Sequence, residues 1–587
     1  MSSAVEYIIN LQDYDLRIYS IAVFVLTPVT VIALRKLLPG FLKRRSHSVY
    51  TDKVISGCLI ALLLILNANV WYFLTQSIIK AHSEYSSSSA KSFNLLHSPV
   101  TKESLNQPYE EFSISGFSFL EVGSDDVENF KCSHVVFHDD HTVKSTKPKS
   151  LDQKNELRLI RKRALHLNST GEYPIIRNYF LDKEGESEDE ILKNKWYKFC
   201  GSAVWMDKYQ VYFFVSRVIY SERSLRNKPT ISLPYAQVFD KNWKEINDYE
   251  FPQSDIKFPA FLPIAFDEHP EGVQLYLGAD DPRVILRNYL DPETNIMEQE
   301  PVIVFNSDSA EIDWKRAIHT YRPFTNSKKA LRLKIRGMEP RKIEKNWAPF
   351  FDEDYSSINF VYSFNPIRVI KCDIVSGECD KQTGPEFEGK KIPEIRGGTN
   401  IVRVPPGFLP KHLASTREYW FGIARSHDFN CGCLKVIYRP HSFLISRALG
   451  SSNYTLDYVS SLFDFNIDTE AWNSKLEYSK CKDGKSVLIP NSISSWDIIP
   501  KDDGAEGELE DVMGITISEA DRNNKIVYVK GFLKHINTVI GGEKAKSSSH
   551  YSSGDTVAIE SNLLGKCATS LADEYCLLTA KRMNWKL

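Results

Sequence analysis

Two adjacent carboxylates, Asp280 and Asp281, stand in the segment Gly278-Ala-Asp-Asp-Pro-Arg-Val284. Neighbouring side chains on a strand point to opposite faces, so only one of the two carboxylates can enter a pocket. The other would brace Arg283 or a backbone amide, and Pro282 would fix the local backbone. A carboxylate placed in this way is suited to general acid or base chemistry. An acidic β-turn with a salt bridge is the structural alternative.

Two other clusters carry groups that could bind a sugar or a phosphate. Asn346 and Trp347 stand in Glu344-Lys-Asn-Trp-Ala-Pro-Phe350, which combines hydrogen-bonding side chains with an indole. Arg396 precedes Gly397-Gly398, where a backbone without side chains would let the guanidinium approach a diphosphate. The structural alternatives are a turn with a core tryptophan in the first case and a tight turn in the second.

A possible metal cluster is formed by Cys132, His134, His138 and His141. Four tetrahedral ligands from one short run would be strained, so we expect Cys132 to form a disulfide instead. Asp352-Glu-Asp354 resembles the Asp-x-Asp of metal-dependent glycosyltransferases, but such triplets are common in acidic loops. We therefore assign no metal ligands, and the sequence carries no phosphate-binding Walker loop, Rossmann fingerprint or Gly-x-Ser-x-Gly.

Short strands rich in aromatic and β-branched residues position these groups from about residue 195 onward. An apolar strand that ends in a polar residue recurs at Val211–Arg217, Pro301–Asn306, Asn359–Asn365, Tyr419–Arg425 and Lys525–Lys530. Arg217, at the end of the first, is a candidate substrate-binding residue. Because a segment rich in Gly, Asn or small residues precedes each strand, we predict a mainly β, five-bladed propeller-like domain with a central pocket. A sandwich with accessory elements is the alternative, and we expect few helices apart from a charged segment near 183–195.

Two apolar runs, 18–34 and 54–74, precede this domain. The second would cover about 31 Å as a helix, which matches the hydrocarbon core of a bilayer. The loop 35–53 is basic, and the positive-inside rule places it in the cytoplasm. A cleaved signal peptide is the alternative. The sequence predicts a tail at 1–17, an anchor of one or two transmembrane helices at 18–76, a stem at 77–110 and a lumenal domain at 111–587.

The cysteines fit a lumenal domain. Cys372 and Cys379 flank a Ser-Gly turn and are expected to close a hairpin by a disulfide. Cys567 and Cys576 could form a second local bridge. Nine cysteines follow the anchor, so at least one should be free or paired between chains. Two glycosylation sequons, which agree with lumenal exposure, begin at Asn168 and Asn453.

The composition excludes several classes of protein. The 587 residues carry 73 Lys+Arg against 75 Asp+Glu, which leaves no basic surplus for a nucleic-acid partner. A mean hydropathy of -0.31 is too low for a polytopic transporter. An apolar fraction of 42% is sufficient for a globular core, so the chain is not disordered as a whole.

Several of these segments resemble the fungal β-mannosyltransferases, glycosyltransferase family 91, which build β-1,2-mannosides in yeast cell-wall glycans. The resemblance runs from about residue 110 to the C-terminus and is carried by Glu344–Phe351, Val361–Cys372, Asp428–Cys433, Ser486–Asn491, Ser495–Asp497 and Ser518–Asn523. Gly278–Arg283 is also similar to the Gly-x-Glu-Asp-Pro-Arg signature of the five-bladed propellers of glycoside hydrolase family 130 and its transferase relatives. The acid or base of that signature maps to Asp281, whereas Asp280 stands where the signature has Glu.

The resemblance implies inverting transfer of mannose from GDP-mannose to a mannose 2-hydroxyl of a mannan glycan, by a membrane protein of the Golgi with a lumenal catalytic domain. Asp281 would then accept the hydroxyl proton, directly or through a neighbouring sugar hydroxyl. Arg283 and Arg396 would neutralise the departing diphosphate, and Trp347 would stack on a sugar. No cofactor is implied beyond the donor, and a need for a divalent metal stays open. A phosphorylase or hydrolase of β-mannosides and a non-catalytic glycan-binding propeller are the alternatives.

Overall fold

The computed structural model describes residues 98–582 apart from 119–130, 133–134, 171–179, 181, 183–184, 268–276, 326–328, 353–354, 386–394, 432–433, 471, 473–484, 501–508 and 542–553. The predicted tail, both apolar runs and most of the predicted stem lie outside these residues, which belong to one compact unit, Ser92–Leu587. Among the described helices, none combines the length and the apolar character that a membrane crossing requires.

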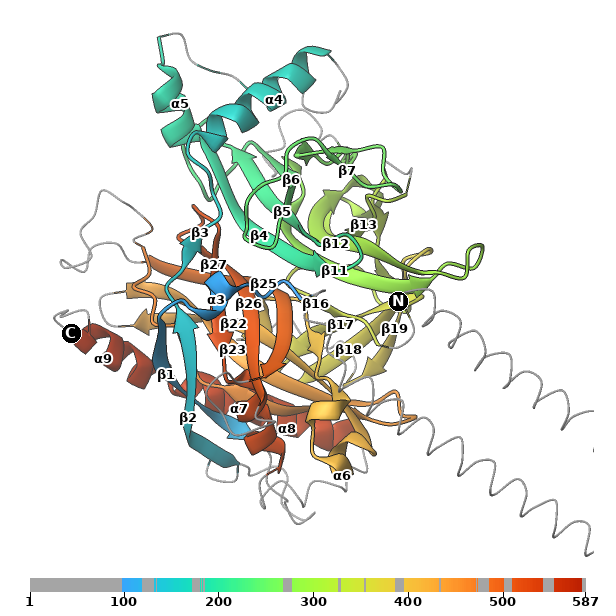
Figure 1. Cartoon of the computed structure of the whole chain (residues 1–587), viewed down its shortest axis with the longest axis vertical. Coiled ribbons are helices and arrows are strands. Elements are labelled where there is room, and N and C mark those ends of the chain that lie inside the picture. The colour runs from blue at the N-terminus through green and yellow to red at the C-terminus, as the bar shows by residue number, and fades with distance from the viewer. Residues whose placement is uncertain are drawn as a thin grey trace, which may run out of the picture. The chain divides into compact units, whose positions relative to one another are not determined.

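The described unit is mainly β, as predicted, and three sheets follow one another along the chain (Figure 1). Sheet 1 contains β4 (Trp196–Met206), β5 (Val211–Tyr220), β6 (Ile231–Phe239), β9 (Ala260–Phe261) and β10 (Leu277–Gly278). Sheet 2 contains β11 (Asp280–Leu290), β12 (Met297–Ser309), β13 (Lys315–Tyr321) and β14 (Leu331–Arg332). Sheet 3 contains β15 (Lys334–Ile335), β16 (Ala348–Phe350), β17 (Ser357–Phe364), β18 (Ile367–Asp373) and β19 (Glu378–Thr383). A short pair, β7 (Tyr249–Glu250) and β8 (Lys257–Phe258), stands apart.

The rest of the chain forms an eleven-stranded sheet. Its strands are β1 (Tyr109–Ser118), β2 (Val136–Thr146), β3 (Lys149–Ser150), β20 (Ile395–Gly397), β21 (Val402–Arg403), β22 (Arg417–Cys431), β23 (Leu434–Ala448), β24 (Tyr454–Ser460), β25 (Lys485–Pro500), β26 (Leu509–Glu519) and β27 (Lys525–Lys530). The N-terminal hairpin β1–β2 lies between β24 and β27, and β25 pairs in parallel with β23. These pairings close seven strands into a barrel, in the order β23-β24-β1-β2-β27-β26-β25.

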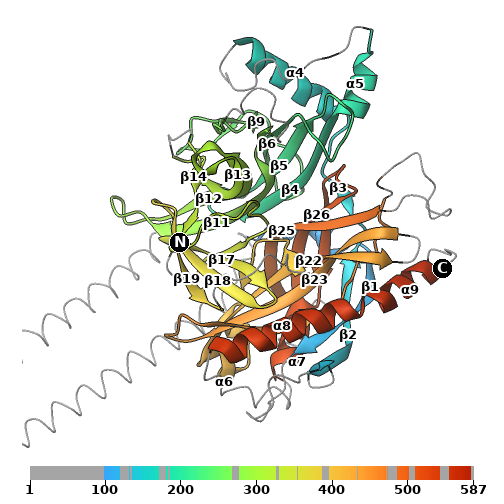
Figure 2. The ribbon, with the colours of Figure 1, turned by 180° about the vertical axis from the view of Figure 1, so that it is seen from behind.

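Helices pack against this scaffold. They are α3 (Lys102–Leu105), α4 (Glu156–Thr170), α5 (Glu188–Lys195), α6 (Lys411–Ala414), α7 (Phe532–Gly541), α8 (Gly554–Ser570) and α9 (Ala572–Arg582), with 3-10 turns η4 (Ala310–Ile312) and η5 (Pro406–Phe408). Helix α7 is largely buried in the apolar cluster of the large sheet. The charged segment near 183–195 does hold a helix, α5, whose N-terminus is closed by a capping box on Ser187. The expectation of few other helices was too low. Helices α8 and α9 form a long C-terminal helical stretch that runs past β1, β22 and β24 (Figure 2).

Successive sheets pack face to face through separate apolar clusters. One cluster contains Val204 of β4 and Val284 of β11, a second contains Val304 of β12 and Phe360 of β17, a third contains Phe350 of β16 and Trp420 of β22, and a fourth contains Phe214 of β5 and Ile526 of β27. Strands β5 and β6 are buried along nearly their whole length, because both faces of sheet 1 are covered in this way. The edge strands β4, β11 and β16 consequently lie next to one another, and β25 contacts β4.

Small polar side chains join these edge strands. The Ser202 hydroxyl accepts a hydrogen bond from the Val284 amide at 2.9 Å, and the Ser492 hydroxyl accepts one from the Ala203 amide at 2.8 Å. Short side chains let the strands approach closely while satisfying backbone donors that the neighbouring sheet would otherwise leave buried. The place where the edge strands meet is therefore held rigidly.

The disulfides confirm one predicted bridge and correct another. Cys372 is bonded to Cys379 at the hairpin of β18 and β19, as predicted. Cys132 is bonded to Cys567, so the expected disulfide at Cys132 is confirmed and the local bridge between Cys567 and Cys576 is wrong. The separation of 435 residues explains why spacing did not reveal the Cys132 bridge. Cys200 is free and buried.

Candidate active site

A cavity of about 440 Å³ lies where the edge strands meet. Its walls include Phe199 and Cys200 of β4, Arg217 of β5, Asp281 of β11, Arg396 of β20, Arg425 of β22, Tyr438 of β23 and Ile489 of β25. Asn346 enters from the loop before β16, and Asp521 enters from the turn after β26. Four of the residues singled out in the sequence, Arg217, Asp281, Asn346 and Arg396, therefore meet in one cavity although 179 positions separate the first from the last.

The backbone is left-handed at four residues that line the cavity. The φ angles are +54° at Cys200, +49° at Asp281, +62° at Asn346 and +48° at Asp521. Non-glycine residues adopt this conformation at a cost of about 1–3 kcal/mol each, so it persists only where the surrounding structure imposes it. Strained residues gather at functional sites, and here they come from four different parts of the fold.

A bulge in β11 separates the two adjacent carboxylates. The pairing with β12 slips between Asp280 and Arg283, so Asp281 faces the cavity while Asp280 turns away and is 6% exposed. Asp280 is ion-paired with Arg217 and Arg316. The expectation that one carboxylate enters a pocket while the other acts as a brace agrees with this geometry. The partners of the brace are these two arginines, since Arg283 binds elsewhere.

Arg283 lies behind the cavity. Its guanidinium donates to the carbonyl of Gly398 and, at 2.9 Å, to that of Pro282, and the side chain is 6% exposed. Arg283 does not line the cavity of about 440 Å³ but lines a small pocket beside Asp281, so its contact with a diphosphate stays a prediction. Arg283 ties β11 to the glycine pair that follows Arg396. A Cβ at Gly397 would stand 2.5 Å from the Asn346 carbonyl oxygen, so the glycine permits close packing of two strands.

Positive charge dominates the cavity. The cavity is lined by four cationic side chains, Arg217, Lys345, Arg396 and Arg425, and by two carboxylates, Asp281 and Asp521. Desolvation lowers the pKa of Lys345 and of Arg396, and the neighbouring Arg425 guanidinium lowers each further. Cations that depress one another's pKa in this way would be relieved by a bound anion. The cavity is thus suited to a phosphate-bearing ligand.

The two carboxylates of the cavity experience opposite environments. Burial disfavours the charge on Asp281, but the guanidiniums of Arg217, Arg425 and Arg283 prevail and hold its pKa well below the usual range. The Arg217 guanidinium lies 3.5 Å from Asp281 and that of Arg425 lies 3.9 Å away. Burial, reinforced by the charge of Asp281, raises the pKa of Asp521 to about 6. Two carboxyl groups whose pKa values are driven apart are typical of acid–base sites.

Aromatic side chains line the cavity, but Trp347 is not one of them. The Trp347 indole is 5% exposed, donates to the Glu344 carboxylate at 3.2 Å and packs on Tyr362 between sheets 2 and 3. Trp347 lines a small pocket that also contains Asp281, so its stacking on a sugar stays a prediction. Tyr438, stacked on His427 at a centroid distance of 4.4 Å, and Trp472 line the cavity instead.

Arg425, Lys345, Tyr438 and Asp521 are cavity residues that the sequence reasoning did not select. A signal for Arg425 was available, because it ends a strand of the same recurring pattern that ends in Arg217. Lys345 lies beside the selected Asn346. Asp521 stands in Ser518–Asn523, one of the segments that carry the family resemblance, but no role was assigned to it. Its turn reaches the cavity through the pairing of β25 with β26 and of β26 with β27.

The remaining predicted residues lie elsewhere. Asn453 is exposed in the turn before β24, and Asn168 is partly exposed in the last turn of α4. Asp352 is buried and ion-paired with Arg447 at 3.3 Å. Over the described residues, no group of three or more His, Cys, Asp or Glu side chains is arranged to hold a metal ion.

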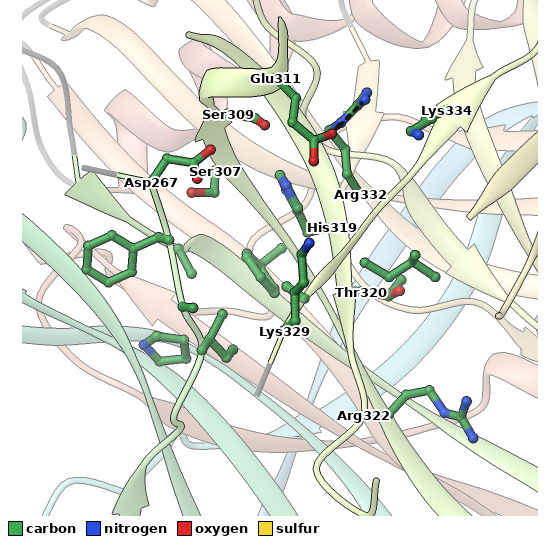
Figure 3. Close-up of a pocket in the computed structure, with 18 of the residues that line it drawn as sticks. Asp267, Ser307, Ser309, Glu311, His319, Thr320, Arg322, Lys329, Arg332 and Lys334 are labelled. Atoms are coloured by element: carbon green, nitrogen blue, oxygen red, sulfur yellow. Dashed lines mark hydrogen bonds and ion pairs between the residues drawn. The ribbon is translucent and has the colours of Figure 1, made fainter. Parts of the chain in front are cut away.

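A second cavity of about 810 Å³ lies beside β12–β14 (Figure 3). Its charged side chains are largely engaged: Arg322 forms two hydrogen bonds with Glu300, and Arg332 is paired with Glu311 at 3.1 Å. His319, which stacks on Phe305, is buried, and its pKa is lowered to about 4. Arg217, Asp281, Asn346 and Arg396 do not line this cavity, so the smaller one is the better candidate for the active site.

A family described as beta-mannosyltransferases matches residues 131–325 and 320–575, which include every residue of the smaller cavity. The chain belongs to the beta-mannosyltransferase family. Beta-mannosyltransferase 3 of Candida albicans is 41% identical over 98% of this chain and 99% of its own length. Beta-mannosyltransferase 1 and Beta-mannosyltransferase 4 of Komagataella phaffii are 33% and 30% identical over 74% and 81% of this chain, and over 66% and 86% of their own lengths.

This beta-mannosyltransferase is accordingly a glycosyltransferase, as the sequence indicated. Among solved structures, a glycoside hydrolase aligns with 57% of the chain and 88% of its own length at 7% identity and a TM-score of 0.31. A likeness of that size supports no argument about function.

Proposed function

We propose that this beta-mannosyltransferase transfers mannose from GDP-mannose, with inversion, to the 2-hydroxyl of a mannose in a cell-wall mannan glycan. The observation that carries the proposal is the cluster of Arg217, Arg396, Arg425 and Lys345 around the ionised Asp281, in a member of this family. A sugar nucleotide presents its diphosphate next to the bond that breaks. A cation cluster beside a carboxylate is therefore the pairing that such a donor needs.

The cations bind the diphosphate and stabilise the charge that develops as it departs. Arg396 and Lys345 are the natural partners, because their lowered pKa values reflect desolvation and mutual repulsion that an anion would relieve. Asn346 and Tyr438 supply hydrogen-bonding groups from neighbouring walls for the sugar hydroxyls. Arg217, ion-paired with Asp280 and Asp281, fixes the geometry of the carboxylates.

Conversion of an α-linked donor into a β-linked product requires one displacement and one general base. The sequence assigns the base to Asp281, and its place at the cavity is compatible with contact to substrate. Such a base contributes about 10²–10⁴-fold to the rate.

The fold and the cellular setting complete the proposal. Five groups of strands pack in a circle around the cavity: sheets 1, 2 and 3, the β20–β24 side of the large sheet and its β25–β27 side. This arrangement supports a five-bladed propeller in which the β1–β2 hairpin joins two of the blades. The apolar runs 18–34 and 54–74 and the basic loop 35–53 support a Golgi membrane anchor with this domain in the lumen. Bridges at Cys372 and Cys132 agree with an oxidising compartment.

The test is donor consumption by the full chain in detergent micelles. We expect GDP release from GDP-mannose that depends on an added mannobiose, and no mannose 1-phosphate from a β-mannoside with inorganic phosphate. Release of mannose 1-phosphate without nucleotide would identify a phosphorylase and overturn the proposal. Binding of mannan with GDP-mannose left intact would identify a glycan-binding protein and overturn it equally.

A further inference from the structure

We infer that Asp521, rather than Asp281, is the general base that removes the proton from the acceptor hydroxyl. The inference rests on the proposed transfer and assigns the proton to a residue that the sequence reasoning passed over. The Asp521 carboxylate takes the hydroxyl proton while the hydroxyl oxygen bonds to C1 of mannose. The bond from C1 to the phosphate oxygen breaks at the same time, its electron pair leaves with GDP, and the proton later passes to water.

The position of Asp521 is fixed by its turn. The Ala520 amide donates to the Val487 carbonyl at 2.8 Å, and the Arg522 amide donates to the Glu519 carbonyl at 3.1 Å. The Asn523 side chain accepts from the Glu519 amide at 3.0 Å. Ala520 and Asp521 are both left-handed, with φ angles of +50° and +48°. A turn held in this strained form by hydrogen bonds on both sides keeps the carboxylate directed at the cavity.

The carboxylates of Asp521 and Asp281 differ in what they already bind. Asp281 accepts from the Cys200 thiol at 3.6 Å and is ion-paired with Arg217 and Arg425. Within the described part of the chain, no hydrogen bond or ion pair engages the side chain of Asp521, which is partly exposed to the cavity. A carboxylate without competing donors keeps all of its lone pairs for an incoming proton, whereas two donors already contact Oδ1 of Asp281.

The basicity of the two groups supports the same division. With a pKa of about 6, Asp521 is about nine-tenths ionised at pH 7 and accepts a proton far more readily than Asp281. Burial is the main cause, followed by the negative charge of Asp281, while Arg217, Arg226 and Arg425 act in the opposite direction. Asp281 thus serves as a fixed negative charge, which stabilises positive charge at C1 and keeps Asp521 basic.

The experiment compares Asp521→Asn, Asp281→Asn and Arg522→Gln in the full chain. Arg522 is the matched control, because it belongs to the same turn and does not line the cavity. We expect kcat of Asp521→Asn to fall at least 100-fold, with thermal stability and the Kd for GDP within threefold of the wild type. Arg522→Gln keeps full kcat.

The pH profile of kcat/KM decides between the two carboxylates. The wild type should lose activity as the pH falls below about 6, the pKa of Asp521. In Asp281→Asn this acid limb moves to lower pH, because the charge that raised the pKa of Asp521 is gone. In Asp521→Asn the limb disappears, and Asp521→Glu recovers part of kcat together with a limb.

Retention of more than a tenth of kcat in Asp521→Asn would overturn the inference, and so would an acid limb that vanishes in Asp281→Asn and persists in Asp521→Asn. These results differ from failure of the proposed function, in which the wild type itself would not release GDP from GDP-mannose.

Discussion

Replacement of Asp280 by Asn tests whether the carboxylate beside Asp281 is a structural brace. The Asp280 side chain is 9% exposed and is ion-paired with Arg217 and Arg316, whose side chains are 12% and 11% exposed. Removal of one partner from a buried ion pair costs about 3–5 kcal/mol, because the remaining charges lose their counterion in a poorly solvated place. Arg316 keeps Asp308 and Arg217 keeps Asp281 at 3.5 Å, so we expect a loss near the lower end of this range, about 3 kcal/mol.

The loss converts into a measurable change in melting temperature. Unfolding entropy of about 2.1 cal/mol/K per residue gives about 1 kcal/mol per degree for a unit of this size. We therefore expect the midpoint of thermal unfolding of Asp280→Asn, followed by circular dichroism, to fall by about 3 °C.

Glu311→Gln is the matched control, because it makes the same chemical change in a pair with Arg332 where the Glu311 side chain is 58% exposed. An exposed pair contributes about 0–1 kcal/mol, so the midpoint should move by no more than about 1 °C. Equal midpoints for the wild type and Asp280→Asn, or equal shifts for the two variants, would refute the assignment of Asp280 as a buried brace.

Three other perturbations follow from the geometry. Arg396→Met removes one charge-assisted contact to the diphosphate, which contributes about 1.5–3 kcal/mol. We therefore expect GDP binding, measured by calorimetry, to weaken about 10- to 100-fold, and an unchanged Kd would place the diphosphate elsewhere. Gly398→Ala puts a Cβ 2.5 Å from the Ile423 carbonyl oxygen and should lower the free energy of unfolding in urea by about 1–3 kcal/mol, whereas unaltered stability would contradict the close packing. His441 is buried, donates to the Ser460 carbonyl at 2.7 Å, and has its pKa lowered by burial to about 4. Because the unfolded chain takes up this proton near pH 6.5, the stability that depends on neutral His441 is complete above that pH and is lost as the pH falls toward 4. The drop in unfolding free energy between pH 7 and pH 5 should therefore be about 2 kcal/mol smaller in His441→Gln, and an identical drop would refute the reasoning.

The sequence predicted the residues of the cavity better than the fold around it. Arg217, Asp281, Asn346 and Arg396 were selected because their types and their places at strand ends are local properties, and all four line the cavity. Trp347 and Arg283 are residue types that equally suit a sugar or phosphate site. Trp347 is nevertheless buried between sheets 2 and 3, and Arg283 donates to the Gly398 carbonyl. Both contacts depend on distant neighbours that the local pattern does not contain.

The features that the sequence did not reveal are those that depend on distant pairing. The hairpin β1–β2 lies between β24 and β27, more than 300 positions downstream, so no local pattern predicts the closed barrel. Asp521 lies in a turn between two strands of the same barrel, and Cys132 is bonded to Cys567, which lies 435 positions away. The long helices α8 and α9 have weakly apolar faces, so periodicity alone did not mark them.

The anomeric configuration and linkage of the product test whether this protein performs inverting β-1,2 transfer. The full chain is incubated with GDP-mannose and an α-mannobiose, and the purified product is analysed by NMR. We expect a new mannose in β-1,2 linkage, formed by the wild type and reduced at least 100-fold in Asp521→Asn. An α-linked product would contradict inverting transfer, and equal transfer by the two proteins would contradict the assignment of Asp521 as the base.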